Sequence, residues 1–436
     1  MAYTFKGGVH PGEHKLTERS AITNFPAPAH LCIPLQQHIG APAKALVSVG
    51  DKVCVGTVLG DTPDALCVPV HSPVSGTVTA ISARVDAMGR KVEHVEIDND
   101  FERTRDNAVE PFTKPILEAS AEELIELIRR AGICGMGGAG FPTYAKLKSA
   151  LNANVDKLII NACECEPYLT ADHRLLLEDP AAVIGGIKIV MRILDLGDAT
   201  IAIEDNKRDA ALLLRQTIQD ELIRVHLLKT KYPQGDERQI IYAITSRQIP
   251  AGKLPSDVGA VVLNAATCAA IYSVLVTGMP LIDRIVTVTG DCVQHPMNLR
   301  VPFGTSFADL FEYCGGFTAE PDKIVTGGPM MGSARFDADG VVTKTTSGLL
   351  ALKQVKDREN GTCIHCGKCA EVCPMYLSPL YFAAYAKVGE YTRALEFDVM
   401  SCVECGACAH ICPGAVPLVQ YIRTAKTYIR EHSPKK

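Results

Sequence analysis

The spacing of hydrophobic and polar positions changes along the chain and divides it into sections. Between about residues 30 and 100, apolar and polar residues alternate in short runs such as VSVGDKVCVGTVLGD, with Gly-Asp and Ser-Gly turns between them. This period of two predicts short β-strands. From about residue 120 the spacing becomes helical in AEELIELIRR and over residues 209–223, and the apolar runs KLIINA and ATIAIE lie between such segments. That alternation predicts an α/β domain to about residue 280.

Two shorter sections complete the chain. Residues 284–335 mix strand-like runs with one helical run and predict a small mixed β domain. From about residue 355, cysteine repeats lie on predicted loops between helical connectors. We therefore expect a multidomain α/β and β protein with domains at residues 1–115, 116–282, 283–340 and 341–436.

One uncharged stretch, residues 258–282, is long enough to span a bilayer. It contains Asn264, Thr267 and Ser273 and has a Gly278…Pro280 break near its end. We interpret it as a buried strand followed by a helix, and we expect no transmembrane segment. The start, MAYTFKGGVHPGEH, has no apolar run typical of a signal peptide.

Composition limits the classes of partner. The 436 residues are 47% hydrophobic and 21% charged, with a net charge of −5. A nucleic-acid binder would usually be basic, so we expect no nucleic-acid partner. Seventeen cysteines in a chain without a secretory signal favour metal ligands or reduced core residues over disulfides.

Eight of these cysteines form two copies of C-x2-C-x2-C-x3-C-P, CIHCGKCAEVCP and CVECGACAHICP. This spacing is typical of [4Fe–4S] ligation, and in two-cluster ferredoxins the fourth cysteine of each copy ligates the other cluster. We predict cluster 1 on Cys363, Cys366, Cys369 and Cys412, and cluster 2 on Cys402, Cys405, Cys408 and Cys373. Zinc is the alternative, but zinc sites more often use paired CxxC knuckles. With a thiolate at every position, His365 and His410 are not expected to be ligands.

A glycine-rich turn, GMGGAGFP, opens a predicted helix. Gly135, Gly137 and Gly140 fit G-x-G-x-x-G, but the turn follows a helix and not a strand, which disfavours an ordinary dinucleotide fold. Unpaired N–H groups at such a turn and the charge of Lys146 can bind a phosphate. A helix–helix turn packed closely on glycine explains the same residues.

Polar residues follow the strand KLIINA, in the sequence NACECEP. Side chains at the carboxyl end of a strand often line the ligand site of an α/β domain. Cys163 and Cys165 form a C-x-C pair, which without further partners makes a poor metal site.

Larger patterns resemble known families. The strands of residues 30–100 resemble the flattened barrel of biotinyl and lipoyl domains, although no lysine lies between Lys52 and Lys91, so a carrier function is disfavoured. GMGGAGFPTYAK, NACECEP with Asp172, and LPSDVG resemble the flavin- and NADH-binding subunit of respiratory complex I. The section after residue 284 is similar to the β-grasp (SLBB-like) domain that follows in that family. The whole domain order, ending in a twin-cluster ferredoxin-like helical domain, resembles the C component of the Rnf complex, a membrane-bound ferredoxin:NAD+ oxidoreductase.

The resemblance implies non-covalent FMN and NAD(H) as substrate, with no residue assigned to catalysis. Phe141 and Glu166 would contact the nicotinamide nucleotide. The flavin would be held by Gly135, Gly137, Gly138, Gly140, Lys146, Asn161, Glu164, Glu237, Asn264 and Thr267. Cys163 and Cys165 depart from the complex I pattern, which has Asp and Ser there.

The resemblance also implies a peripheral subunit on the cytoplasmic face of the membrane. Its partners would be the other subunits of an Rnf-type complex and, indirectly, ferredoxin. FMN would exchange electron pairs with NAD(H) and single electrons with the clusters, while other subunits move Na+ or H+. The alternatives are a soluble NADH-dependent diaphorase or cobalamin-reductase-type flavoprotein, and a two-cluster relay without nicotinamide chemistry.

Overall fold

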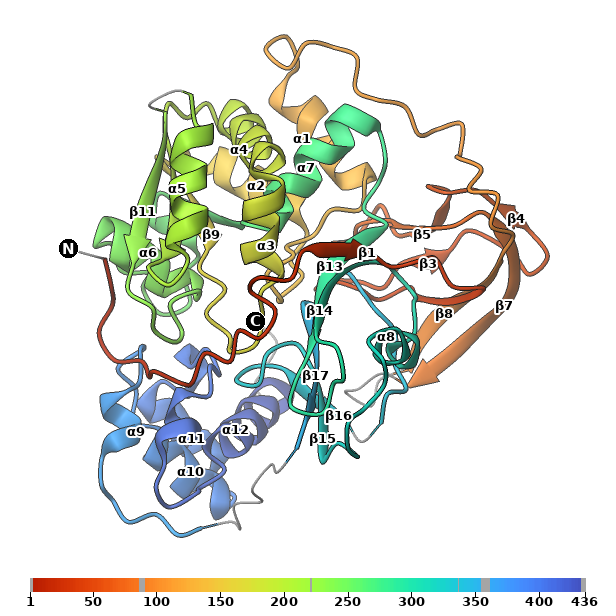
Figure 1. Cartoon of the computed structure of the whole chain (residues 1–436). Helices are drawn as coiled ribbons and strands as arrows, with labels where there is room; N and C mark the ends of the chain where they lie inside the picture. The colour runs from red at the N-terminus through yellow and green to blue at the C-terminus, as the bar shows by residue number, and fades with distance from the viewer. Residues whose placement is uncertain (1–2, 86–90, 220–221, 336, 354–360, 433–436) are drawn as a thin grey trace.

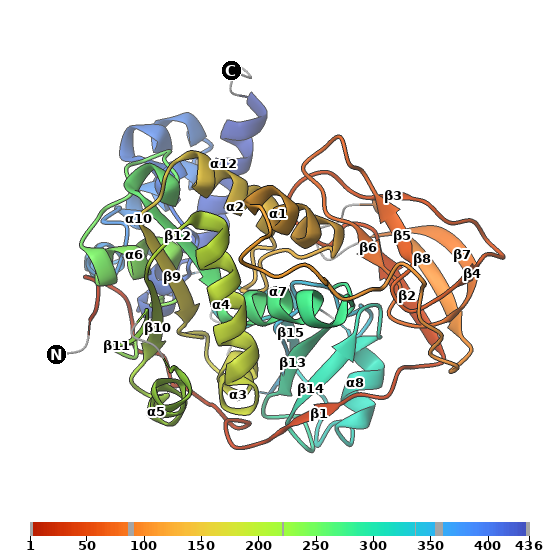
Figure 2. The same ribbon diagram turned by 90° about the horizontal axis from the view of Figure 1, so that it is seen from above.

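The computed structural model describes residues 3–85, 91–219, 222–335, 337–353 and 361–432. They form a two-sheet sandwich, an α/β domain, a six-stranded sheet and a helical module that carries the cysteine repeats (Figure 1). Seen from above, the sandwich lies to one side of the α/β domain and the cysteine module lies at another (Figure 2).

The sandwich confirms the strands predicted between residues 30 and 100. Its antiparallel sheets have the orders β2-β8-β7-β4 and β3-β5-β6. Alternate side chains face inward, so that Leu31, Ile33, Val95 and Ile97 are completely buried. The strands are β2 (His30–Pro34), β3 (Lys44–Ala45), β4 (Lys52–Val53), β5 (Val58–Asp61), β6 (Val70–His71), β7 (Gly76–Val85) and β8 (Lys91–Asn99).

The α/β domain contains a parallel sheet of order β11-β10-β9-β12. Parallel strands are covered on both faces, which explains why KLIINA and ATIAIE are continuous apolar runs. The strands are β9 (Lys157–Ala162), β10 (Ala199–Glu204), β11 (Ile223–Leu228) and β12 (Ala260–Asn264). The helices are α1 (Ala121–Arg130), α2 (Thr143–Asn152), α3 (Ala171–Glu178), α4 (Pro180–Leu194), α5 (Arg208–Thr217), α6 (Glu237–Thr245) and α7 (Ala265–Thr277), and η1 (Pro255–Val258) is a short 3₁₀ turn.

The helix predicted over residues 209–223 is too long. Helix α5 ends at Thr217, and Ile223 already begins β11, with residues 220–221 outside the described part of the chain. All of β11 pairs in parallel with β10, from Ile223 opposite Ala199 to Leu228 opposite Glu204. Pairing at the sheet edge overrides the helical spacing of this segment.

The uncharged stretch 258–282 is a strand followed by a helix, as predicted. Strand β12 lies at one edge of the parallel sheet beside β9, and α7 packs against α4. The side chain of Asn264 caps α7, and Gly278 ends the helix with a φ of 72°. In the part of the chain that the structure describes, no helix is long and apolar enough to cross a membrane.

The six-stranded sheet has the order β1-β14-β13-β17-β15-β16 and carries one helix, α8 (Phe307–Tyr313). Two of its strands lie outside the range 283–340 expected for this domain, namely β1 (Ile22–Asn24) and β17 (Gly348–Leu352). Strand β1 pairs in parallel with β14, and β17 lies between β13 and β15. The other strands are β13 (Asp283–Thr289), β14 (Met297–Pro302), β15 (Lys323–Thr326) and β16 (Ser333–Arg335).

The cysteine module consists of short helices around a small core. Helices α10 and α12 pack on each other through Phe382, Ile422, Ala425 and Ile429. Its helices are α9 (Lys368–Glu371), α10 (Pro379–Lys387), α11 (Ala407–Ile411) and α12 (Leu418–His432), with 3₁₀ turns η2 (Tyr391–Phe397) and η3 (Val399–Ser401). Residues 3–20, here named the N-terminal arm, run between this module and the α/β domain before they reach β1 (Figure 1).

Candidate functional site

A cavity of about 1010 Å³ lies where the α/β domain, the six-stranded sheet and the sandwich meet. Its size is at the upper end for small-molecule and cofactor sites. The twelve residues predicted for flavin and nicotinamide binding all line it: Gly135, Gly137, Gly138, Gly140, Phe141, Lys146, Asn161, Glu164, Glu166, Glu237, Asn264 and Thr267. The structure therefore brings together residues that lie up to about 130 positions apart in the sequence.

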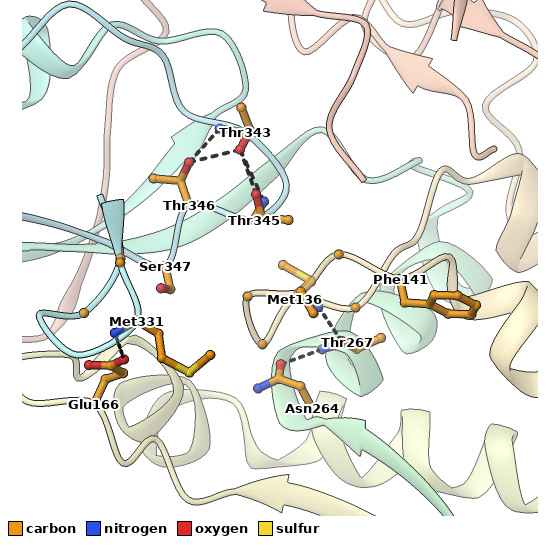
Figure 3. Close-up of a pocket in the computed structure, with 18 of the residues that line it drawn as sticks. Met136, Phe141, Glu166, Asn264, Thr267, Met331, Thr343, Thr345, Thr346 and Ser347 are labelled. Carbon is orange, nitrogen blue, oxygen red and sulfur yellow. Dashed lines mark hydrogen bonds between the residues drawn. The ribbon is translucent and has the colours of Figure 1, made fainter. Parts of the chain in front are cut away.

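The glycine turn forms a closed loop between α1 and α2. The amide of Gly135 donates to the carbonyl of Phe141 at 2.9 Å, and Met136 N–H donates to Thr267 Oγ1 at 3.0 Å (Figure 3). Gly138 has a φ of 118°, and a Cβ added there would meet no atom within 4 Å. The loop thus presents bare backbone to the cavity, as a turn that holds an anionic ligand does.

The first turn of α2 adds polar groups to this wall. Thr143 is 1% exposed and lines the cavity, and within the described residues its hydroxyl has no hydrogen-bond partner. One turn later, Lys146 Nζ lies 2.6 Å from Glu237 Oε2 and 3.1 Å from the carbonyl of Val262. A ligand phosphate could therefore accept a hydrogen bond from the Thr143 hydroxyl. It could also form an ion pair with Lys146, which Glu237 already contacts.

Two asparagines mark the carboxyl ends of neighbouring strands. Asn161 lies near the end of β9, opposite Asn264 of β12 in the sheet register. Asn161 Nδ2 donates to the carbonyl of Gly235 at 2.8 Å. Asn264 Oδ1 accepts from the first amides of α7, while its Nδ2 donates to Asp172 Oδ2 at 2.6 Å. Both side chains are fixed at the edge where α/β ligand sites form.

The acidic turn after β9, residues 163–169, is also fixed. Glu164 accepts from the amides of Asp172 and His173 at 2.8 and 3.1 Å, so its carboxylate lies at the N-terminal end of α3. Glu166 accepts from the amide of Met331 at 2.8 Å (Figure 3) and from that of Met330 at 3.0 Å. Glu166 therefore ties the α/β domain to the loop between β15 and β16.

Two lysines hold the backbone of the acidic turn. Lys15 Nζ, from the N-terminal arm, donates to the carbonyls of Glu164, Glu166 and Leu169 at 3.0, 2.8 and 2.6 Å. Lys207 is 2% exposed, and its Nζ donates to the carbonyl of Cys163 at 2.6 Å and to Glu204 Oε2 at 2.9 Å. No local pattern in the sequence associates either lysine with this turn.

Other cavity residues were also missed by sequence reasoning. The segment after β16 contributes four hydroxyl side chains opposite the glycine loop: Thr343, Thr345, Thr346 and Ser347 (Figure 3). Arg284 of β13 is 3% exposed, and its Nη2 donates to the carbonyl of Met136 at 3.2 Å. The polar run VTKTTSG was the one signal that could have pointed to this wall.

Asp172, at the base of the cavity, predicts a pH dependence of stability. Burial, and then the nearby charge of Glu164, raises the pKa of Asp172 to about 7. Because this carboxyl has a higher pKa folded than unfolded, the folded state binds more protons between about pH 4 and 7, and stability from this group falls as pH rises through that window.

We expect Asp172→Asn to remove this loss of stability at higher pH. The free energy of unfolding of the variant minus that of the wild type should increase by about 2–3 kcal/mol from pH 5 to 8. Urea unfolding of the flavin-free protein at pH 5 and pH 8 measures it. Asp64→Asn, at an exposed position, is the control and should show no such trend. A pH-independent difference for Asp172→Asn would contradict the prediction.

Cys163 and Cys165 are separate thiols within the protein. Cys163 is fully buried, with its Sγ 3.5 Å from the carbonyl of Ala202, and Cys165 Sγ accepts from Gly235 N–H at 3.2 Å. Burial raises the pKa of both thiols. They remain neutral where the complex I pattern has an acid and a hydroxyl.

The cysteines assigned to cluster 2 meet around a second, small cavity. Cys373 from the first repeat lies there with Cys402, Cys405 and Cys408 from the second. Burial raises the pKa of Cys405 to about 12, with further contributions from Cys402 and Cys373. Amides of Glu404 and Leu377 lie 3.3 and 3.4 Å from the sulfurs of Cys402 and Cys373, as in cluster sites where N–H groups bond to sulfur.

The cysteines assigned to cluster 1 lie nearer the surface. Cys363 and Cys366 are exposed, and Cys369 and Cys412 are half-buried. Ile364, between the first two, is 65% exposed. The two predicted ligand sets therefore differ in depth.

Cys405 lines both cavities. One member of the cluster 2 set thus forms part of the wall of the large cavity. The residues present fit both kinds of group: a glycine loop with an unpartnered buried hydroxyl suits a phosphate-bearing cofactor, and four thiols that line one small cavity, with nearby amides, suit an iron–sulfur cluster.

Comparison with known proteins assigns a family to each of the four parts of the fold. Four family models match: an RnfC barrel sandwich hybrid domain at residues 3–102, the Nuo51 FMN-binding domain at 128–273, an SLBB domain at 285–334 and a 4Fe-4S dicluster domain at 362–416. The expected fold class is therefore confirmed, as are FMN and [4Fe–4S] clusters as cofactors.

Full-length relatives were also found. The C component of a Na(+)-translocating ferredoxin:NAD(+) oxidoreductase complex from Acetobacterium woodii is 42% identical over 98% of this chain and 97% of its own length. The proton-translocating counterpart from Clostridium ljungdahlii is 41% identical over 98% and 94%, and the C component of an ion-translocating oxidoreductase complex from Rhodobacter capsulatus is 39% identical over 100% and 85%.

Among solved structures, the fold is similar to a chain of an NAD+-reducing [NiFe]-hydrogenase in the H2-reduced state. The TM-score is 0.52 at 16% identity, over 74% of this chain and 68% of that one. At this identity the likeness concerns the fold alone.

Proposed function

Because the chain belongs to the RnfC family, the C components of ion-translocating ferredoxin:NAD(+) oxidoreductase complexes, we propose that it exchanges electrons between NAD(H) and its clusters in such a complex. It would do so as a peripheral subunit on the cytoplasmic face of the membrane, while other subunits receive electrons from ferredoxin and move the ion. The chain is an electron-transfer subunit with FMN and two [4Fe–4S] clusters as cofactors.

A single observation carries the proposal. Cys405 belongs to the cluster 2 set and lines the cavity that holds all the predicted flavin residues. A bound flavin and cluster 2 would then share one protein wall, which is what transfer between them needs. A cavity with no contact to the cysteine module would have supported a binding role only.

When bound, FMN exchanges electrons in pairs with NAD(H) and singly with iron–sulfur clusters. The glycine loop, the start of α2 and Lys146 would bind and orient its phosphate-bearing chain. Asn161 and Asn264 would position polar groups at the sheet edge. Phe141 and Glu166 stay the residues proposed for the nicotinamide nucleotide, which would enter from the open side of the cavity and exclude water there.

The depth of the two cysteine sets supports an order of transfer. Cluster 2, beside the flavin cavity, would exchange electrons with the flavin, and cluster 1 would exchange them with another subunit. Around cluster 1, Cys363, Cys366 and Ile364 are exposed, which gives a partner close access to this end of the relay. We therefore assign the contact with the rest of the complex to this face.

Cofactor analysis of the anaerobically purified chain, followed by titration with NADH, tests the proposal. We expect one FMN and about eight irons per chain, bleaching of flavin absorbance by NADH, and cluster EPR signals that appear as NADH is added. Eight irons with no flavin and no response to NADH, even after FMN is added, would instead identify a two-cluster relay.

Lys146→Met makes the same experiment specific for the cavity. Loss of a charge-assisted hydrogen bond of about 1.5–2.5 kcal/mol should weaken FMN binding roughly 10- to 70-fold, measured by quenching of flavin fluorescence. The iron content should not change, because Lys146 lies in the α/β domain. Lys148→Met, at an exposed position on the same helix, is the matched control. Equal FMN affinity in both variants would remove Lys146 from the proposed site.

A further inference from the structure

The N-terminal arm contacts both cofactor regions before it enters the sheet. Gly8 N–H donates to the carbonyl of Val372 at 2.7 Å, and Val372 precedes the cluster 2 residue Cys373. Farther along the arm, Lys15 holds the acidic turn of the flavin cavity through three backbone carbonyls. The arm thus spans from a cluster 2 ligand to the cavity wall.

Tyr232 joins the arm to the other side of cluster 2. Its backbone exchanges two hydrogen bonds with Val9, at 2.8 and 2.9 Å. Its side chain is 1% exposed, and the hydroxyl donates to the carbonyl of Cys405 at 2.7 Å. Cys405 comes from the second repeat and Val372 from the first, so the Gly8–Val9 segment and Tyr232 hold both halves of the cluster 2 ligand set.

Tyr232 is also fixed to the flavin cavity. Tyr232 and the residues after it, Pro233, Gly235 and Asp236, all line that cavity. Asp236 then caps α6, and Gly235 bonds to Asn161 and to Cys165. A shift of Tyr232 would therefore move the cavity wall and the Cys405 loop relative to each other.

The space around this contact is fully used. A Cβ added at Gly7 would lie 3.0 Å from the carbonyl oxygens of Val372 and Cys373, and one added at Gly8 would lie 2.6 Å from the carbonyl oxygen of Tyr232. Gly7 and Gly8 have positive φ angles, of 74° and 80° respectively. Only glycine allows the arm to pass this closely between Tyr232 and the cluster 2 loop.

We propose that the Gly7–Val9 segment and Tyr232 form a positioning bridge that sets the placement of cluster 2 relative to the flavin. The bridge contacts the backbone of the ligand loops, so the cysteine sulfurs remain available to bind iron. Hydrogen bonds and packing around a cluster set its potential, and the geometry between two redox groups sets how readily an electron passes. The inference rests on the proposed ligand set of cluster 2.

Tyr232→Phe in the full chain loaded with flavin and iron tests the bridge. It removes one hydroxyl and leaves the cysteines in place. We expect an unchanged iron content, and FMN content and bleaching of the flavin by NADH are measured alongside, so that cluster reduction is timed from the reduced flavin. Reduction of the clusters after the flavin should be several-fold slower, because electron transfer slows as the distance between two redox groups grows. The EPR signal and midpoint potential of one cluster should shift, and those of the other should not.

Tyr272→Phe is the control, because Tyr272 belongs to α7 and packs against Gly185 of α4, away from the bridge. It should behave as the wild type in all of these measurements. If Tyr232→Phe also leaves the cluster spectra, potentials and reduction rate unchanged, the bridge has no positioning role and the proposal is wrong.

Gly8→Ala tests the arm independently, since its added methyl would press on the Tyr232 carbonyl. We expect the flavin to be reduced at the normal rate and the clusters to be reduced more slowly. Gly252→Ala is its control: Gly252 has a φ of 72° but open space around its Cβ position, so it carries backbone strain without a clash. If the two substitutions had equal effects, backbone strain alone would explain the result, and the proposed bridge would be wrong.

Iron analysis of Cys405→Ser separates the two ways in which the inference could fail. If that variant keeps all its iron, the ligand set is wrong and the Tyr232 results do not concern cluster 2. If it loses about half, the ligand set stands, and the Tyr232 and Gly8 variants alone decide the bridge.

Discussion

Replacing Cys405 by serine is expected to remove cluster 2 and to stop electron transfer between NADH and cluster 1. Cys405 is one of four thiols around the small cavity, and a serine hydroxyl is a much poorer ligand for iron than a thiolate. Iron should fall from about eight to about four per chain. The flavin should still bleach with NADH, because its predicted phosphate and sheet-edge contacts come from other residues. Cluster 1 should then stay oxidised, with a rate of reduction at least about a hundredfold lower.

Cys363→Ser is the informative comparison. It removes an exposed cysteine of the cluster 1 set, and NADH should still reduce the remaining cluster 2 through the flavin. EPR of each variant after NADH addition distinguishes the two. If Cys363→Ser blocks reduction by NADH while Cys405→Ser does not, the order of the two clusters is the reverse of our proposal.

The second large effect is expected at Lys344, a fully buried residue in the segment after β16 that contributes the four hydroxyl side chains to the cavity. Its Nζ donates to the carbonyl of Pro69 in the sandwich and to that of Gly132, just before the glycine loop, both at 2.7 Å. Lys344→Met keeps a similar volume but leaves both buried carbonyls without this donor. The free energy of unfolding should fall by about 2–5 kcal/mol, since each unsatisfied buried group costs about 1–3 kcal/mol.

The pH dependence identifies Lys344 as the cause. Burial lowers the pKa of Lys344 to about 8 from its usual value near 10.5. Between these two values the unfolded chain binds more protons, so stability from this group rises with pH. The deficit of Lys344→Met relative to wild type should therefore be larger at pH 9.5 than at pH 7, measured as the urea midpoint. Lys52→Met, at an exposed residue of the sandwich, should show neither effect.

Local patterns in the sequence were enough to predict most elements and the chemistry of the cysteine repeats. The alternation in residues 30–100 and the apolar runs of β9 and β10 each reflect burial of their own segment. The repeats carry their ligand spacing within twelve residues each. Recognition of the flavin residues depended on resemblance, because the glycine loop alone fits a plain helix–helix turn equally well.

What could not be predicted depends on contacts between distant segments. Nothing in the surroundings of Lys15 or Tyr232 in the sequence indicates that they meet the acidic turn and the Cys405 loop, 149 to 173 positions away. The start of β11 was predicted wrongly as helix for the same reason, because pairing with β10 decides the conformation of this segment. The hydroxyl wall at residues 343–347 gains its meaning only when the sheet brings it opposite the glycine loop.

The N-terminal arm also has a consequence for biosynthesis. Strand β1 needs β14, and Gly8 needs Val372, so the arm pairs with segments that are synthesised much later than the arm itself. At about 5–20 residues per second, the arm waits on the order of a minute for the cysteine module. The sandwich can fold during that time, because it has its own sheets and core, whereas the core of the α/β domain is continuous with that of the six-stranded sheet. Docking of the arm is then a late step, which joins the finished modules after iron ligands from both repeats have become available.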